Sequence, residues 1–125
     1  MKKIVLVVLL STLTSCQDNE TLSQDQAALD LQDMFTEIES MVNTISCDNS
    51  DDWTFIGYGS KVCGGVVGYI AYPEFIDTQL FIERIEAHKQ AQEDFNKKFQ
   101  IVGTCDVPRE PTDVLCDDGA PKFVY

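Results

Sequence analysis

Two residue types in this 125-residue chain could support chemistry: a single histidine, His88, and five cysteines. A histidine that acts as a general acid or base needs a nucleophile or an acidic group within hydrogen-bond reach. No serine lies in the glycine-flanked pattern of a nucleophile elbow, and the cysteines fit other roles better. We therefore predict that His88 is a packed structural residue and that the protein is not an enzyme, and we assign no catalytic residue.

The first cysteine, Cys16, closes an N-terminal segment that has three distinct parts. Lys2 and Lys3 are basic, residues 4–10 are all apolar, and residues 13–16 read Leu-Thr-Ser-Cys. This order is typical of a secretory signal peptide. Residues 13–16 also resemble the lipobox of bacterial lipoproteins. That resemblance implies lipidation of the Cys16 sulfur, cleavage just before it and acylation of the new amino end.

We accordingly expect a signal peptide over residues 1–15 and a membrane anchor of palmitate-type acyl chains at Cys16. One acyl chain binds a bilayer marginally, whereas two or more hold stably. An ordinary signal peptide that releases a soluble protein is the main alternative. A transmembrane helix is less favoured, because it needs about 20 apolar residues and the apolar run here is far shorter.

Four cysteines remain after Cys16, at positions 47, 63, 105 and 116. An even number of cysteines in an exported chain predicts disulfides, here two. A four-cysteine zinc site is the rival, but its ligands come in close pairs, two to four residues apart, and none of these cysteines is so close to another. We predict no metal and no cofactor.

Path lengths favour pairing Cys63 with Cys105, and Cys47 with Cys116. A strand of about nine steps from Cys63 covers about 30 Å, and a helix over residues 77–99 returns about 34 Å. Cys105 should therefore come back to Cys63. Cys47 precedes an antiparallel strand and should lie at the opposite end, within reach of Cys116 along the remaining chain.

The formal net charge is −12. A chain this acidic repels nucleic acid and anionic headgroups, so we expect no nucleic-acid partner. The acidic run at residues 48–52 fails the EF-hand pattern, since Trp53 and Gly59 occupy the positions for glycine and glutamate. The glycines around Cys63 lack the ending of a phosphate-binding loop. Both segments are predicted to be structural. The negative net charge is expected to serve solubility, and binding of a basic partner or a cationic ligand is the alternative.

The segment after Cys16 is polar and has no apolar period, so we predict a flexible tether over residues 16–26. Its acidic start, Asp18 to Glu20, resembles the surface-export signal of Bacteroidota lipoproteins. That resemblance implies the outer membrane. An ordinary polar linker is the equal alternative, so the membrane face stays open.

Residues 27–125 are predicted to form a single α+β domain. Apolar residues recur at helical spacing over 27–46, with Asp25 as N-cap, and over 77–99, with Asp77 or Thr78 as N-cap. Between these helices, two β-favouring runs around a glycine-rich connector predict a hairpin over 51–72. Pro108, Pro111 and Pro121 exclude a helix from most of the tail, and residues 122–125 are expected to add an edge strand.

The region from Cys47 to Gly119 resembles a family of small, uncharacterised bacterial secreted or lipid-anchored proteins. The resemblance is carried by Cys63-Gly64-Gly65, by residues 68–72, by Thr104-Cys105 and by Cys116 to Gly119. Family members often have proline where this chain has Val66, and many have a further cysteine near Ala120. The resemblance brings no activity to this chain.

The function expected from the sequence is that of a lipid-anchored cell-envelope protein that binds a protein or small ligand without catalysis. A protease-inhibitor-like module that presents the Cys63-Gly64-Gly65 loop is the alternative. A small hydrolase is a third alternative. An exposed convex loop would favour the inhibitor, and a concave pocket with paired polar groups would favour the enzyme.

Overall fold

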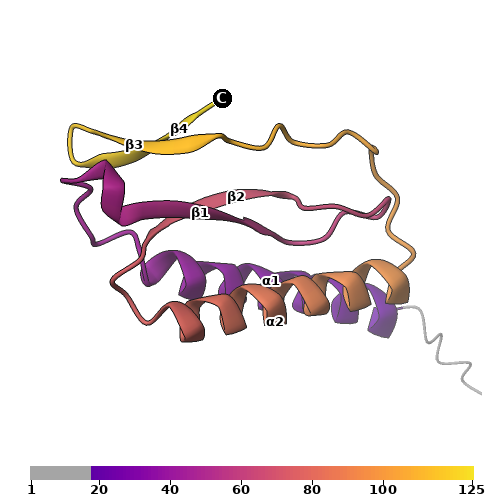
Figure 1. The fold of residues 1–125 in the computed structure, drawn as a ribbon. Helices are drawn as coiled ribbons and strands as arrows, with labels where there is room; N and C mark the ends of the chain where they lie inside the picture. Colours follow the sequence, from indigo (N-terminus) through magenta and orange to yellow (C-terminus); the bar gives the residue numbers. More distant parts are fainter. Residues whose placement is uncertain (1–17) are drawn as a thin grey trace, which may run out of the picture.

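The computed structural model describes residues 18–125, which form a small α+β domain of three layers (Figure 1). Helices α1 (Asp18–Ser40) and α2 (Thr78–Lys98) form the first layer. The hairpin of β1 (Trp53–Tyr58) and β2 (Gly68–Pro73) lies on them. A second hairpin, β3 (Asp113–Asp117) and β4 (Ala120–Val124), lies on the far side of the first. The predicted signal peptide and Cys16 fall outside the described residues.

The central hairpin is covered on both faces, because side chains that alternate along each strand pack against different layers. Trp53 pairs with Pro73 and Tyr58 with Gly68 in one antiparallel register. Ile56 and Ile70 pack on a cluster that Ile38, Phe81 and Ile85 build between the helices. On the opposite face, Trp53, Phe55 and Ala71 of the first hairpin pack against Val114 and Phe123 of the second hairpin. The period of two along a strand explains this division.

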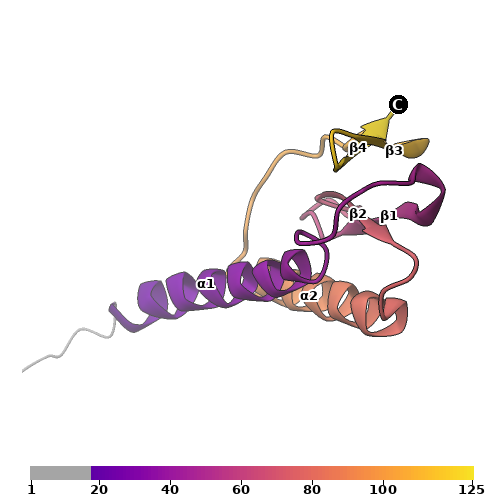
Figure 2. The same ribbon diagram turned by 90° about the vertical axis from the view of Figure 1, so that its left-hand side faces the viewer.

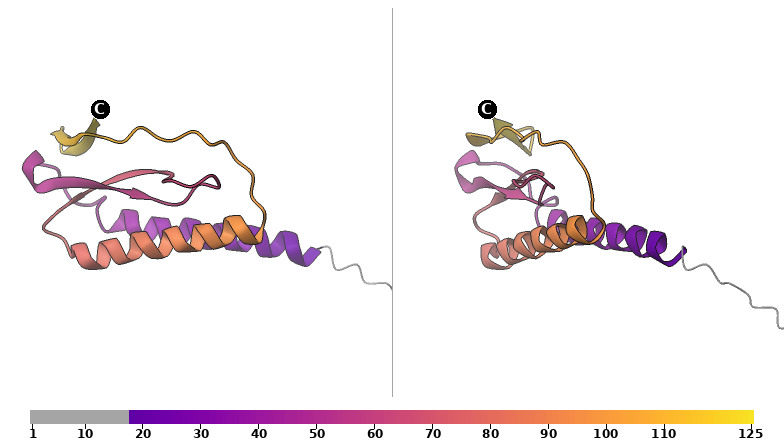
Figure 3. Two further views of the ribbon diagram at one scale, coloured as in Figure 1. Left: turned by 45° about the vertical axis from the view of Figure 1, so that its right-hand side comes forward. Right: turned by 90° about the vertical axis from the view of Figure 1, so that its right-hand side faces the viewer.

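Helix α1 differs from its prediction at both ends. It begins at Asp18, so most of the predicted tether is helical and Asp25 is not an N-cap. Polar residues without glycine or proline can extend a helix without packing, and Gln26 donates to Asp30 one turn later, 2.9 Å away. Figures 2 and 3 show the first turns of α1 projecting beyond the hairpins. The polar composition was therefore not a sign of disorder here.

At its other end α1 stops at Ser40, whereas the prediction ran to residue 46. Tighter turns follow, in which the Val42 amide bonds the Glu39 carbonyl and the Ile45 amide bonds the Val42 carbonyl. Val42 is still buried in the helical core. The apolar spacing thus located the buried side chains correctly while the backbone left the α-helical path.

Helix α2 agrees with its prediction. Asp77 is the N-cap, and its carboxylate accepts a hydrogen bond from the Leu80 amide at 3.0 Å. Phe81, Ile85 and His88 form its buried stripe. The helix runs antiparallel to β2 (Figure 1), which is the arrangement that the disulfide prediction assumed.

The second hairpin was predicted only in part, as an edge strand at residues 122–125. Strand β3 was missed, and β4 begins at Ala120. Asp118 and Gly119 connect the two strands, and both have positive φ, 53° and 76°. An Asp-Gly pair between two strands is the usual sequence of a type I′ turn, so the signal for this hairpin was present in the sequence.

Candidate functional site

The connection between β1 and β2, residues 59–67, forms a tight projecting loop that we call the tip loop. Gly64 donates its amide to the Lys61 carbonyl at 2.9 Å, and Lys61 donates to the Gly65 carbonyl at 3.0 Å. Gly64 and Gly65 both have positive φ, a conformation that glycine adopts without steric cost. Residues 62–65 are all exposed. The Cys63-Gly64-Gly65 segment is therefore a convex turn at the surface.

Helix α2 holds the base of the tip loop through Ser60, which is only 7% exposed. Gln92 accepts a hydrogen bond from the Ser60 amide at 2.8 Å, and Asn96 donates to the Ser60 carbonyl at 2.9 Å. The Ser60 hydroxyl lies 3.4 Å from a carboxylate oxygen of Glu93. Buried backbone groups are costly when unpaired, so these three side chains, one turn of α2, fix where the loop starts.

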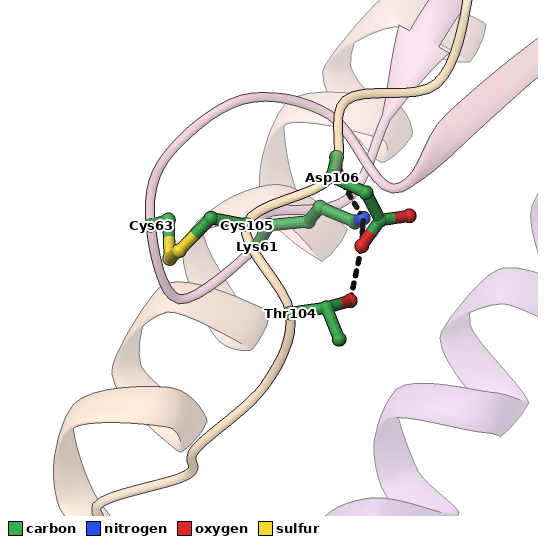
Figure 4. A network of polar contacts seen from close by, with 5 residues as sticks. All are labelled: Lys61, Cys63, Thr104, Cys105 and Asp106. Atoms are coloured by element: carbon green, nitrogen blue, oxygen red, sulfur yellow. Dashed lines mark hydrogen bonds and ion pairs between the residues drawn. A yellow bond between two sulfur atoms is a disulfide. The ribbon is translucent and has the colours of Figure 1, made fainter.

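The tail fixes the other side of the tip loop, as Figure 4 shows. Cys63 is bonded to Cys105, with their Cα atoms 5.5 Å apart. Lys61 reaches past this disulfide, where its ammonium bonds the backbone carbonyl of Asp106 and lies 3.2 Å from the Asp106 carboxylate. A hydrogen bond from Thr104, followed by those from Lys61, lowers the pKa of the Asp106 carboxyl. Tip loop and tail thus form one braced unit.

Apolar side chains surround this unit without being covered. Val62 is 38% exposed, Val107 is 74% exposed and Val102 is 91% exposed. A methyl group built on Gly103 would lie 3.5 Å from Val62, so the tail and the tip loop are in close contact here. A shallow cleft of about 290 Å³ lies between the loop and α2, with Lys61, Glu93 and Lys97 among its lining residues. Exposed apolar side chains that gather in one region are a feature of surfaces that contact another molecule.

The second disulfide joins Cys47 to Cys116, with their Cα atoms 5.1 Å apart. Cys47 precedes β1, so this bond lies at the opposite end of the hairpin from the tip loop. The Cys47 amide also donates to the Gly119 carbonyl at 2.9 Å. Both predicted pairings are therefore confirmed. The chain runs outward along β2 and returns a similar distance along α2, which brings Cys105 back to Cys63.

His88 lies between the two helices and is 6% exposed. Its ring packs against Phe35, with the ring centroids 5.4 Å apart. Burial lowers its pKa, and hydrogen bonding to the Leu31 backbone opposes this shift to a smaller extent. Nδ1 has no hydrogen-bond partner among residues 18–125. A buried histidine against an aromatic ring has the surroundings of a packing residue, and its position on the buried stripe is as predicted.

The acidic run at residues 48–52 forms a turn and the short 3₁₀ helix η1 (Ser50–Asp52), which Asn49 caps. Across the part of the chain that the structure describes, no three histidine, cysteine or acidic side chains are grouped so as to hold a metal ion. Within the same residues, no helix combines the length and apolar character that crossing a bilayer requires.

Sequence reasoning missed the residues that brace the tip loop. Gln92, Glu93 and Asn96 sit among other polar residues on α2, and their types give no sign of a partner 32 to 36 positions earlier in the chain. Lys61 and Asp106, 45 positions apart, were missed for the same reason. Only the Cys63–Cys105 bond, which was predicted, pointed to this part of the molecule.

Comparison with known proteins gives no relative for this chain. No family model, no curated protein and no solved structure matches it.

Proposed function

We propose that the protein is a lipid-anchored cell-envelope protein that binds a partner through its tip loop and has no catalytic activity. The anchor is Cys16, and the segment before it supports this assignment by its order of basic, apolar and lipobox-like parts. The outer membrane is the proposed location.

The observation that carries the binding role is the braced tip loop. Two side chains of α2, the Cys63–Cys105 bond and the Lys61–Asp106 pair hold it from three directions. A surface that is already rigid loses little conformational entropy when it binds. The exposed Val62, Val102 and Val107 supply apolar area that a partner could bury. The partner of this surface is proposed to be a protein.

The convex shape of residues 62–65 supports the inhibitor-like alternative. The position of Lys61 limits which side chain of the loop could enter a protease. The Lys61 side chain is only 19% exposed and its ammonium is bound by Asp106. It is therefore not free to enter the specificity pocket of a protease. If the loop inhibits a protease, Val62 is the side chain available for that pocket, which favours an enzyme that accepts small apolar residues.

Two experiments test this proposal separately. Cells fed a fatty-acid analogue should label the wild-type protein and not Cys16→Ala, and equal labelling of both would refute the anchor. For binding, a photo-crosslinking amino acid at position 62 should capture a protein on intact cells. The same group at Leu115, which is 50% exposed on β3, is the matched control. Equal capture from both positions would refute a role for the tip loop.

A further inference from the structure

Strand β2 has a free edge whose backbone groups can be identified from the hydrogen bonding. Glu74 donates its amide to the Asp52 carbonyl at 2.8 Å, in line with the register of the hairpin. Hydrogen-bonded pairs alternate along an antiparallel ladder, so Tyr72 and Ile70 bond to β1. The N–H and C=O groups of Tyr69 and Ala71 then point away from β1. Within residues 18–125, β2 is paired with β1 and with no other strand.

This edge opens into a groove between the layers. One wall comes from α1 and the turns after it, and includes Phe35 and Glu39; the other comes from β4 and its turn, and includes Phe123. Tyr69, Ile70 and Ala71 of β2 form the floor, and the volume is about 410 Å³. A second hollow of about 460 Å³ shares Tyr69 and Phe123 and continues to Arg109. Together the two hollows follow β2 from Gly68 to Ala71.

The β2 edge also lacks the protection that exposed edges usually have. Native proteins guard such edges with charged residues, bulges or a covering segment. Strand β4 contains Lys122 and β3 contains two aspartates, whereas the six residues of β2 are uncharged. Only Pro73, at the end of the strand, limits pairing. An uncharged edge that forms the floor of an aromatic groove has the features of a site that accepts another strand.

Charge indicates what kind of strand fits. Glu39 is the acidic residue among those that line the groove, and the exposed Asp118 precedes Gly119, which also lines it. The cation of the second hollow, Arg109, lies over the Tyr125 ring, 5.5 Å from the ring centroid. Glu39 acts on Tyr58 in the groove, since its charge adds to burial in raising the Tyr58 pKa. A second copy of this chain would bring another net charge of −12 against the first, which opposes association. A cationic segment from a different protein is favoured instead.

We propose that the β2 edge binds an extended, basic polypeptide segment from a partner protein by strand addition. Tyr69 and Ala71 would exchange main-chain hydrogen bonds with this segment, and Glu39 would attract its basic side chain. Six residues of β2 span about 20 Å, enough for about six residues of the partner. None of the residues that line the two hollows belongs to the tip loop, so this inference goes beyond the proposed function and has a test of its own.

Main-chain pairing tolerates many side chains, so simple synthetic peptides are adequate probes. The full chain with Cys16→Ala is mixed with a millimolar alternating peptide, Ac-KVTVTVK-amide, and amide hydrogen exchange is followed by NMR. In the free protein the Tyr69 and Ala71 amides should exchange fast, and those of Ile70 and Tyr72 slowly. The peptide should slow exchange at Tyr69 and Ala71 about tenfold or more. A version of the peptide with alternate N-methyl groups, which cannot pair, should have no effect.

Matched variants test the charge. Glu39→Lys should weaken binding of the basic peptide about two- to fivefold, the range of a partly exposed ion pair. Asp33→Lys, an equal change at an exposed position on the same helix, should leave it unchanged. Equal binding of an acidic Ac-EVTVTVE-amide peptide would overturn the basic specificity. Absence of protection by any peptide would overturn the site. If the Tyr69 and Ala71 amides of the free protein became more protected as the protein concentration rose, the edge would pair with a second copy of this chain, and the proposal of a different partner would be overturned.

Discussion

Asn96 on α2 donates a hydrogen bond of 2.9 Å to the carbonyl of Ser60, which lies 36 positions earlier in the chain. Together with the Gln92 acceptor on the Ser60 amide, it satisfies both backbone groups of a buried residue. The position of the tip loop therefore depends on one turn of α2 and not on the loop's own sequence alone.

Asn96→Ala should lower the free energy of unfolding by about 1–3 kcal/mol, because the buried Ser60 carbonyl loses its partner. Amide exchange in residues 60–67 should also speed up. Gln90→Ala is the control, since Gln90 bonds only to the exposed Asp94 on its own helix and should cost a few tenths of a kcal/mol. Chemical denaturation and hydrogen exchange measure both effects. Equal losses in the two variants would contradict the bracing role of Asn96.

The two disulfides should differ in their rate of reduction. Cys63 and Cys105 are both exposed, whereas Cys47 is 2% exposed, and thiol exchange requires access to sulfur. Under a mild reductant the Cys63–Cys105 bond should open first, as timed alkylation and mass spectrometry would show. Opening of Cys47–Cys116 first would contradict the burial argument. The Cys63–Cys105 bond closes a loop of 42 residues, so its removal should cost about 4 kcal/mol in the chain-entropy model.

His88 should make the stability of the protein depend on pH. Burial lowers its pKa in the folded state, so the unfolded chain takes up the proton more readily. The free energy of unfolding should therefore fall as pH drops below about 6.5, the ordinary histidine pKa, until the folded pKa is passed. His88→Leu removes this contribution. Urea unfolding of both proteins from pH 8 to pH 5 should give profiles that diverge at acid pH, and parallel profiles would disprove the prediction.

Gly119→Ala should destabilise the protein by about 1–2 kcal/mol, since an L-residue at positive φ is strained and Gly119 has φ of 76°. Gly119 connects β3 to β4, and its carbonyl also accepts a hydrogen bond from the Cys47 amide. The strain would therefore fall on the turn of the second hairpin. Gly103→Ala is the control. Gly103 has no positive φ, and an added methyl meets only Val62 at 3.5 Å, so a change within about 0.5 kcal/mol is expected. Thermal unfolding of both variants would decide the matter.

Much of this fold could be predicted because it depends on local patterns and simple lengths. The spacing of Phe81, Ile85 and His88 identified α2 and its buried stripe. The out-and-back path of β2 and α2 was enough to pair Cys63 with Cys105. These inferences required only the rise per residue of a strand and of a helix.

What could not be predicted depends on tertiary contacts or on weak local signals. Helix α1 starts at Asp18 in a polar segment that no apolar period marks. The bonds of Ser60 to Gln92 and Asn96 exist only once α2 packs beside the tip loop. The β2 edge groove is also tertiary, because α1 and β4 form its walls. The second hairpin is different, because its Asp118-Gly119 turn is a local signal that the sequence itself carries.

The early start of α1 changes what an anchor at Cys16 would do to the domain. Ten flexible residues would give only reach, about 16–19 Å of free travel in any direction. A helix of 23 residues that begins at Asp18 is instead a rigid lever about 34 Å long, with a single residue, Gln17, between it and the lipid. The tilt of that lever relative to the bilayer would set which way both the tip loop and the β2 groove face. In an anchored protein, the angle between α1 and the bilayer would then determine the orientation of the whole domain.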